Sequence, residues 1–270
     1  MRWLEQLYAL EPFARQYLVA GMLVLARVTG LVMSAPILGM QEAPMRIRGL
    51  FALALTLLVL PSQWNTPVEN PKTLFDMSVL IGQEALVGLA LGLGLMVLLG
   101  GIQVAGQLIG QISGMSLAEI FNPAFEDNVP FFSQLLFLVT VAVFLGIGGH
   151  RQIVSALMDT FVAVPLATGG LGDSIAHTMT TLVAQSFTLG VRAAAPVVTA
   201  LLLATIVMGL LSRTLPQLNL MVLGFGINAL VGIGATALTL GAMAWVFQGQ
   251  VDVVLETITD GIANSGGVRD

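Results

Sequence analysis

Long uncharged runs constrain the fold of this chain more than any other feature of its sequence. The runs 85–118, 128–150 and 214–251 contain 34, 23 and 38 consecutive residues without Asp, Glu, Lys or Arg. A helix that crosses a bilayer needs about 20 apolar residues at a rise of about 1.5 Å each. We therefore predict an all-α integral membrane protein with about six apolar helical segments, partly as broken hairpins: 17–40, 47–61, 79–105, 131–149, 180–212 and 217–247.

The composition excludes several other classes of protein. Hydrophobic residues make up 56% of the chain and charged residues only 9%, whereas a soluble domain carries about 25% charged residues. The absence of Cys excludes disulfides, thiolate metal sites and a cysteine nucleophile. A net charge of −5 and a single lysine, Lys72, argue against a nucleic-acid-binding surface.

The ends of the chain differ from its apolar middle. We expect residues 1–250 to form a single membrane-embedded helical domain and 251–270 to form a polar C-terminal tail. Residues 3–13 have the spacing of a short amphipathic helix. This start contains acidic residues, and the apolar stretch that follows contains Arg27, so we do not expect a cleaved signal peptide.

The run 85–118 carries glycine and glutamine at helical spacing. Gly88 and Gly92 are four residues apart, a spacing that lets two helix backbones touch. Gln103, Gln107 and Gln111 repeat this spacing and stack on one helical face. Glutamine is costly against lipid, so this face should meet protein or water. Packing against another helix and a pore-lining or subunit-facing role are both compatible with the pattern.

Four charged side chains lie within apolar segments: Arg27, Glu84, Arg192 and Arg213. Each is expensive against lipid and is expected to face protein, water or a partner subunit. Arg27 and Glu84 have opposite charges and could pair. We favour a buried structural ion pair or a subunit contact, with a proton relay at Glu84 as the alternative.

Catalytic and metal-binding motifs are absent from the sequence. His150 and His177 are 27 residues apart and have no carboxylate or Cys partners at metal-ligand spacing. The sequence also lacks Gly-x-Ser-x-Gly, His-Glu-x-x-His and a Walker lysine loop. We therefore expect neither enzyme activity nor a cofactor.

The segment 114–125 interrupts the apolar helices. Its Asn122-Pro123 pair ends a helix, because the residue before proline is biased to an extended conformation. Met115, Phe121 and Phe125 are bulky, and Met is flexible enough to seal around varied shapes. Two interpretations are open: a surface loop anchored by two Phe, and a plug inside a channel.

A set of short blocks lies in a fixed order along residues 20–235. The blocks are Arg27-Val28-Thr29-Gly30, Pro36, Pro44 with Arg46, Glu84 with Gly88 and Gly92, Ala105-Gly106, Gln111-Ile112-Ser113-Gly114, Asn122-Pro123, Gly148-Gly149-His150, Ala156-Leu157, Phe161, Pro165, Ala195-Pro196 and Arg213-Thr214-Leu215-Pro216-Gln217-Leu218-Asn219. In these blocks the chain resembles the FliR family of the flagellar type III protein-export gate, including its injectisome counterparts. Two positions depart from the family pattern: Thr160, where the family often has Ser, and Asn122, where Asp is frequent.

This resemblance implies a non-enzymatic subunit whose fold is like a P and a Q export-gate subunit joined. Its expected partners are FliP-type and FliQ-type subunits, an FlhB-type switch protein, membrane lipid and unfolded protein substrates. The assembly would form the export channel of the flagellar basal body in the bacterial inner membrane. A loop of the R subunit plugs the closed pore in that family. The matching stretch here is 114–125, so Met115, Phe121 and Phe125 are the expected pore-facing residues.

The main alternative function is a six-helix transporter of small solutes or ions. Such a transporter would show an inverted repeat and a substrate site at broken helices near the membrane midplane. The sequence contains neither an evident repeat nor a cluster of midplane polar residues. An intramembrane enzyme, the second alternative, would need a nucleophile or a metal motif.

Overall fold

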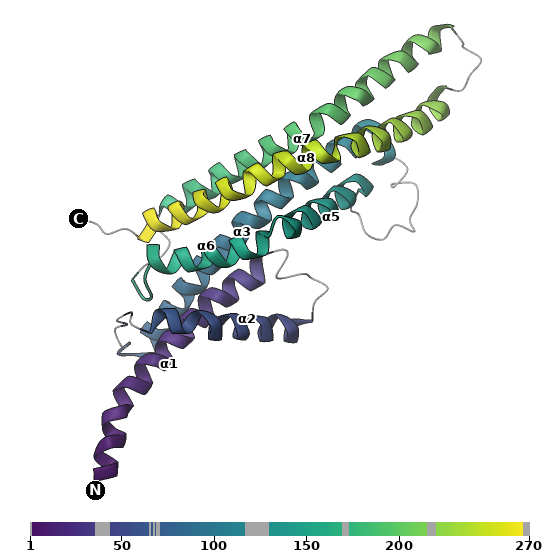
Figure 1. Ribbon diagram of the computed structural model, residues 1–270. Coiled ribbons are helices and arrows are strands. Elements are labelled where there is room, and N and C mark those ends of the chain that lie inside the picture. The colour runs from purple at the N-terminus through teal and green to yellow at the C-terminus, as the bar shows by residue number, and fades with distance from the viewer. Residues whose placement is uncertain are drawn as a thin grey trace. The chain divides into compact units, whose positions relative to one another are not determined.

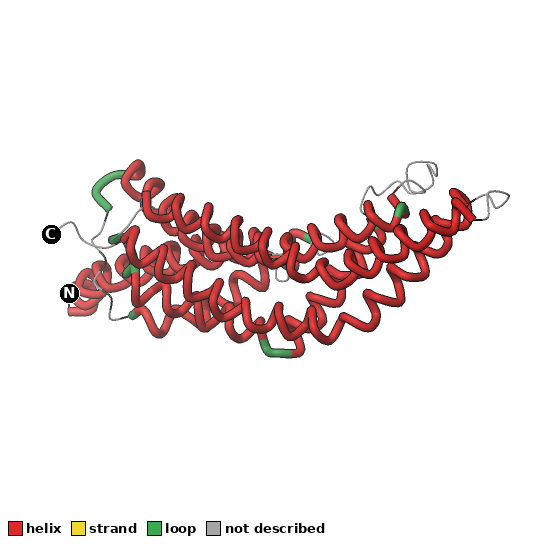
Figure 2. Tube along the Cα trace, turned by 90° about the horizontal axis from the view of Figure 1, so that it is seen from above, coloured by secondary structure: helices red, strands yellow, loops and turns green. Residues whose placement is uncertain are grey.

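A computed structural model of the chain describes residues 2–35, 44–64, 66, 68, 71–116, 130–168, 173–214 and 220–266. Every regular element among these residues is a helix, and none is a strand (Figure 2). The helices, labelled in Figure 1, are α1 (Arg2–Ser34), α2 (Met45–Val59), the 3₁₀ turn η1 (Leu60–Gln63), α3 (Leu74–Ser113), α5 (Phe131–Gly146), α6 (Gly149–Ala163), α7 (Asp173–Thr214) and α8 (Leu220–Gly266).

The helices confirm the predicted all-α membrane architecture. Five of those in the described part of the chain are long and apolar enough to cross a bilayer, and α5 with α6 adds a sixth, broken span. α1 joins the expected 3–13 helix and the first apolar segment into one helix. α6 was not expected as a separate helix, because Arg151 and Asp159 interrupt its apolar residues. These charged residues lie on the exposed side of α6.

The end of α8 extends into the stretch expected as a polar C-terminal tail, 251–270. Residues 251–266 continue the helix. Glu256 and Asp260 are exposed, while apolar residues recur every three or four positions, the pattern of an amphipathic helix. The buried apolar residues of this stretch are Val251, Val254, Leu255, Ile258 and Ile262.

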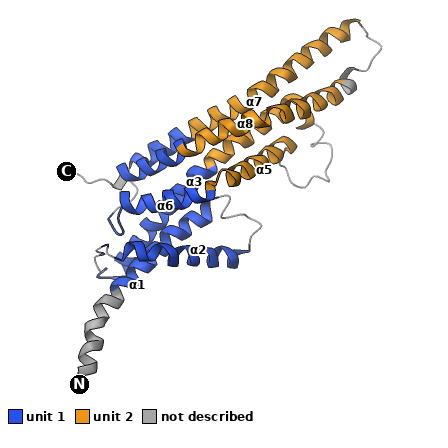
Figure 3. Cartoon of the chain, in the orientation of Figure 1, with its two compact units in different colours: residues 1–96, 150–182, 253–270 blue, residues 97–149, 183–252 orange. Residues whose placement is uncertain are grey.

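The chain folds as two compact units built from interleaved segments, where one domain over 1–250 was expected (Figure 3). Unit 1 comprises residues 1–96, 150–182 and 253–270. Unit 2 comprises residues 97–149 and 183–252. The helices α3, α7 and α8 each contribute one part to each unit.

Local sequence signals set the helix boundaries. Pro44 and Pro130 stand immediately before α2 and α5, where a missing N–H costs nothing. The start of α3 has a reciprocal cap: Asp76 N–H donates to Thr73 Oγ1 and Thr73 N–H donates to Asp76 Oδ2, both at 3.1 Å. Gly148, at φ 79°, separates α5 from α6 with a left-handed residue that glycine adopts readily.

In unit 1 the backbones of α1 and α3 touch through glycine. A Cβ on Gly88 would collide with the carbonyl oxygen of Arg27, and a Cβ on Gly30 would collide with that of Ala85. Gly92 meets Ser34 in the same way. The contact predicted from the Gly88 and Gly92 spacing is therefore confirmed, and α1 is its partner.

The same contact predicts a steric effect of one methyl group. We expect Gly88→Ala to destabilise unit 1 by about 1–3 kcal/mol, because the added Cβ forces α1 away from α3. Gly82→Ala, on the same helix, is the matched control, since nothing lies within 4 Å of that Cβ. Thermal unfolding of both variants in detergent measures the difference. Equal melting temperatures would contradict the close packing.

In unit 2, glycine also mediates the packing of α3. Cβ atoms on Gly101 and Gly190 would strike the carbonyl oxygens of Ser186 and Gly101, so α3 and α7 touch. Gly106 meets the backbone of Ser133 on α5. Ser133 Oγ also donates to the carbonyl oxygen of Gln103 at 3.0 Å. Small residues therefore make the closest backbone approaches of α3 in this unit, beside the buried side chains of Ile102 and Ile109.

Much of the apolar surface of α7 and α8 is uncovered by the described chain. Only 17% and 22% of their most apolar windows are buried. Leu230 and Leu238 on α8 are 73% and 88% exposed, and Leu203 on α7 is 59% exposed. Apolar area of this extent requires lipid or partner protein as its environment.

Candidate functional site: a buried charge network

The contact between α1 and α3 brings two distant charges together. Arg27 lies three residues before Gly30 on α1, and Glu84 lies four residues before Gly88 on α3. Because the glycines allow close approach, side chains one turn away from the contact can meet. The Arg27 and Glu84 side chains are 0% and 3% exposed. The structure thus joins the pair that the sequence left open.

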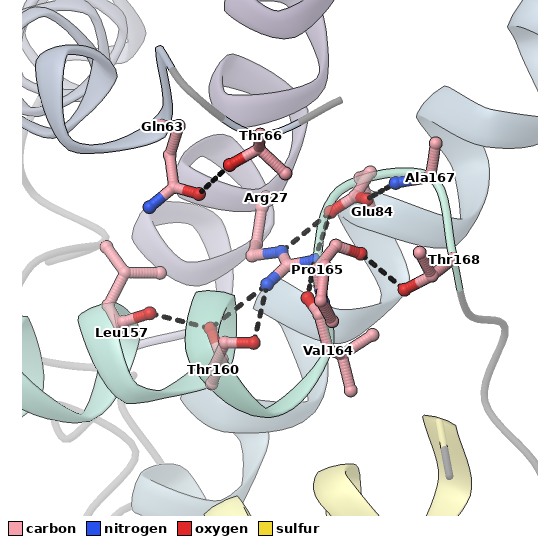
Figure 4. A network of polar contacts seen from close by, with 10 residues as sticks. All are labelled: Arg27, Gln63, Thr66, Glu84, Leu157, Thr160, Val164, Pro165, Ala167 and Thr168. Carbon is pink, nitrogen blue, oxygen red and sulfur yellow. Dashed lines mark hydrogen bonds and ion pairs between the residues drawn. The ribbon is translucent and has the colours of Figure 1, made fainter. Parts of the chain in front are cut away.

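The Arg27 guanidinium is bound on all sides (Figure 4). Its Nε and Nη2 atoms each lie 2.6 Å from Glu84 Oε2. Nη1 donates to the carbonyl oxygen of Thr160 at 2.9 Å and to its hydroxyl at 3.4 Å, and Nη2 donates to the carbonyl oxygen of Val164 at 3.0 Å. The five N–H groups of arginine therefore have five acceptor contacts. The ring of Phe161 adds a cation–π contact at 4.3 Å.

Glu84 extends the network to the turn after α6. Its Oε1 accepts a hydrogen bond from the backbone N–H of Ala167 at 3.0 Å. Ala167 has φ 63°, a left-handed conformation that non-glycine residues rarely adopt. Thr168 Oγ1 closes the same turn by donating to the carbonyl oxygen of Pro165 at 2.7 Å. The carboxylate thus holds a strained turn in place.

Chemically, this arrangement is suited to fixing three segments rather than to moving protons. Both carboxylate oxygens of Glu84 are occupied, and the charge of Arg27 is balanced within hydrogen-bond distance. Removing one partner of such a pair is far more damaging than replacing both. Across the described residues, no group of three His, Asp or Glu side chains could hold a metal ion.

A conservative pair of substitutions tests the Thr160 contact. Thr160→Val removes the hydroxyl acceptor and leaves a buried Arg27 N–H unsatisfied, so we expect a loss of about 1–3 kcal/mol. Thr160→Ser keeps the hydroxyl and should unfold close to wild type. Thermal unfolding in detergent distinguishes the two. A Val variant as stable as wild type would mean that the hydroxyl contributes nothing measurable, whereas a Ser variant as unstable as the Val variant would mean that the methyl group also contributes.

The other two predicted intramembrane charges lie elsewhere. Arg192 and Arg213 are on α7 in unit 2, and both are exposed. Neither forms an ion pair with any residue that the structure describes. They have no role in the Arg27 network.

Of the three predicted plug residues, Met115 alone falls within the described residues. It is half-buried, follows directly on the end of α3, and its N–H lies 3.4 Å from Ser113 Oγ. Gly114 beside it has φ 79°, and a Cβ there would crowd the ring of Phe225 on α8. Phe121 and Phe125 lie outside the described residues.

The backbone groups that complete the network were not predicted from the sequence. Carbonyl oxygens of Thr160 and Val164 and the N–H of Ala167 carry no signature in side-chain composition. A signal was nevertheless present: Thr160 and Phe161 fall on the apolar face of an amphipathic stretch that stops before Pro165. This pattern marks the end of a buried helix, where free carbonyl oxygens collect.

Together these features define an all-α integral membrane protein whose described buried charges are neutralised within one unit. Residues 18–254 match the family model described as bacterial export proteins, family 1. The chain belongs to this family, and the resemblance to the FliR family is confirmed.

Three relatives indicate how far the similarity extends. The flagellar biosynthetic protein FliR of Escherichia coli (strain K12) is 32% identical over 214 residues, which cover 79% of this chain and 81% of that protein. The FliR of Caulobacter vibrioides (strain ATCC 19089 / CIP 103742 / CB 15) is 29% identical, covering 88% and 94%. The FliR of Bacillus subtilis (strain 168) is 25% identical, covering 92% and 96%.

Proposed function

We propose that the chain is a non-enzymatic subunit of the flagellar type III protein-export gate in the bacterial inner membrane. The observation that carries this proposal is a family match over 18–254, together with relatives named flagellar biosynthetic protein FliR that align over most of both chains. The long apolar helices are compatible with a membrane location.

The proposed assembly contains FliP-type and FliQ-type subunits and an FlhB-type switch protein. Two properties of α7 support a protein environment for it. Large apolar side chains such as Ile206 and Leu210 are 59% and 60% exposed, and exposed Arg192 and Arg213 lie on the same helix. Because arginine is costly in hydrocarbon, a partner subunit or water is a better environment than lipid for at least these parts of α7.

Within this channel, the segment 114–125 would plug the closed pore. Supporting this, Gly114 ends α3 with a left-handed residue, so the chain leaves the helix axis immediately before Met115. Compliant Met and bulky Phe side chains can exclude ions and still yield to many substrate shapes. Fixed charges would bind passing substrates too tightly.

Two measurements test the assignment. In a flagellated bacterium lacking its own FliR, expression of this chain should restore motility and export of flagellar protein. An affinity-tagged chain extracted in detergent should carry FliP-type and FliQ-type subunits, identified by mass spectrometry. Recovery as a lone, transport-active dimer would instead support the small-solute or ion transporter. Restoration of injectisome secretion without motility would transfer the proposal to that system.

A further inference from the structure

The glutamine ladder of α3, Gln103, Gln107 and Gln111, lies on an uncovered face of unit 2. Gln107 and Gln111 are exposed and Gln103 is half-buried. None of their side-chain amides has a hydrogen-bond partner within the described part of the chain. On the same face, nothing lies within 4 Å of a Cβ placed on Gly100. The ladder therefore points away from this unit's own packing.

The remaining faces of this part of α3 are occupied. Gly101 meets α7, Gly106 meets α5, and Ser113 lies 3.6 Å from the Cβ position of Gly232 on α8. Small residues together with buried Ile102 and Ile109 thus make the contacts inside the unit, and the long amide side chains lie outside them. Their occupant must come from beyond the residues of this unit that the structure describes.

The chemistry of the ladder excludes lipid as that occupant. Each glutamine presents two N–H donors and a carbonyl acceptor, and hydrocarbon satisfies neither. Three amides spaced four residues apart on an otherwise apolar helix therefore need water or polar groups along about two helical turns.

We propose that this ladder lines the water-filled export path and hydrogen-bonds the peptide groups of extended polypeptides in transit. The inference rests on the proposed export-gate function. Its first support is position: the ladder ends at Gln111, three residues before Gly114, where the proposed plug segment 114–125 begins. A path closed by that plug would run along the ladder that leads to it.

The second support is dimensional and chemical. Residues four apart on a helix are spaced about 6 Å along its axis. Equivalent peptide groups of an extended chain recur every two residues, or about 6.6 Å. Amides both donate and accept, as peptide groups do, and they carry no charge. The ladder would therefore hydrogen-bond the backbone of any unfolded polypeptide, whatever its side chains.

The absence of Cys from this chain makes a clean test possible. Gln107→Cys and Gln111→Cys would each place one thiol in this subunit, within the complete complex in inverted membrane vesicles. Leu203→Cys is the control, because Leu203 is 59% exposed on the apolar surface of α7. A small charged methanethiosulfonate reagent should modify the two ladder thiols and spare the control. A flagellar substrate arrested in the gate by a folded C-terminal domain should block this modification. When an added oxidant such as copper phenanthroline accepts the two electrons, a Cys in that substrate should also form a disulfide with a ladder thiol.

Ladder thiols that resist the aqueous reagent, or that cross-link to another gate subunit whether or not substrate is present, would overturn the inference in favour of a subunit contact. Motility separates this failure from that of the proposed function. If the wild-type chain restores export but the thiols of the Gln107→Cys and Gln111→Cys variants behave in this way, only the ladder inference fails. If the wild-type chain restores no export, the proposed function fails first.

Discussion

Glu84→Ala should destabilise unit 1 by about 3–5 kcal/mol, because it leaves the fully buried Arg27 without its counter-charge. The loss includes the hydrogen bond that holds Ala167 in its left-handed turn. We expect a sharply lower melting temperature in detergent and a lower yield of the assembled complex. Arg27→Met should be comparably damaging, because it leaves the Glu84 carboxylate buried and unpaired.

The double variant Arg27→Met with Glu84→Met is the decisive control. Replacing both members of a buried pair by apolar side chains is often close to neutral, so the double variant should be more stable than either single variant. The coupling between the two changes then measures the interaction. Additive losses would show that the two residues act independently and would contradict the ion-pair account.

The same double variant separates a structural role from a proton relay. If the pair only holds α1, α3 and the turn after α6 together, a stable double variant should still support motility. A relay would require an ionisable group at position 84, so a well-assembled double variant without export would favour the relay. Export and melting temperature therefore have to be measured on the same preparation.

The long helices were predictable from the sequence because few backbone structures satisfy their hydrogen bonds inside hydrocarbon. A run such as 85–118, with no charge to interrupt it, has to satisfy its backbone hydrogen bonds internally, and a helix does so. The Gly88 contact was predictable for a related reason, since small residues at that spacing are how such helices approach one another. Both are local properties of a single segment.

Two helical stretches were not predicted, because charged residues recur among their apolar residues with the period of a helix. α6 and residues 251–266 both carry acidic residues on an exposed side and apolar residues on a buried one. Searching for uncharged runs overlooks such segments, although a helical-period search would have found them. Residues 150–163 and 253–266 of these stretches belong to unit 1, so the helical content of that unit was underestimated.

The site was only partly predictable because charge is visible in a sequence and backbone geometry is not. Arg27 and Glu84 stood out as opposite charges in apolar segments. The carbonyl groups that accept hydrogen bonds from Arg27 are set by the position at which α6 ends. That position follows from tertiary packing. The network is therefore a product of the fold of unit 1, recognisable beforehand only by its two charged members.

Substituting glycine in the proposed plug should open the idle gate to ions. Burying a Phe or Met side chain stabilises the closed state by roughly 1.5–3 kcal/mol. Because about 1.4 kcal/mol changes an equilibrium constant tenfold, Phe121→Gly or Met115→Gly should raise the ion conductance of the idle gate by about tenfold or more. Conductance of the purified complex in planar bilayers measures the leak. Met115→Leu should keep the seal, because a bulky apolar side chain remains.

Met45→Gly is the matched control for this prediction, since Met45 is 68% exposed at the start of α2 in unit 1. It removes the same side chain outside the plug segment and should leave conductance unchanged. A leak from Met45→Gly equal to that from Met115→Gly would indicate general loosening of the complex. Unchanged conductance in both plug variants would leave 114–125 as a surface loop. The ion barrier would then have to lie in another part of the path, because a hydrophobic seal cannot lose its bulky side chains and stay closed.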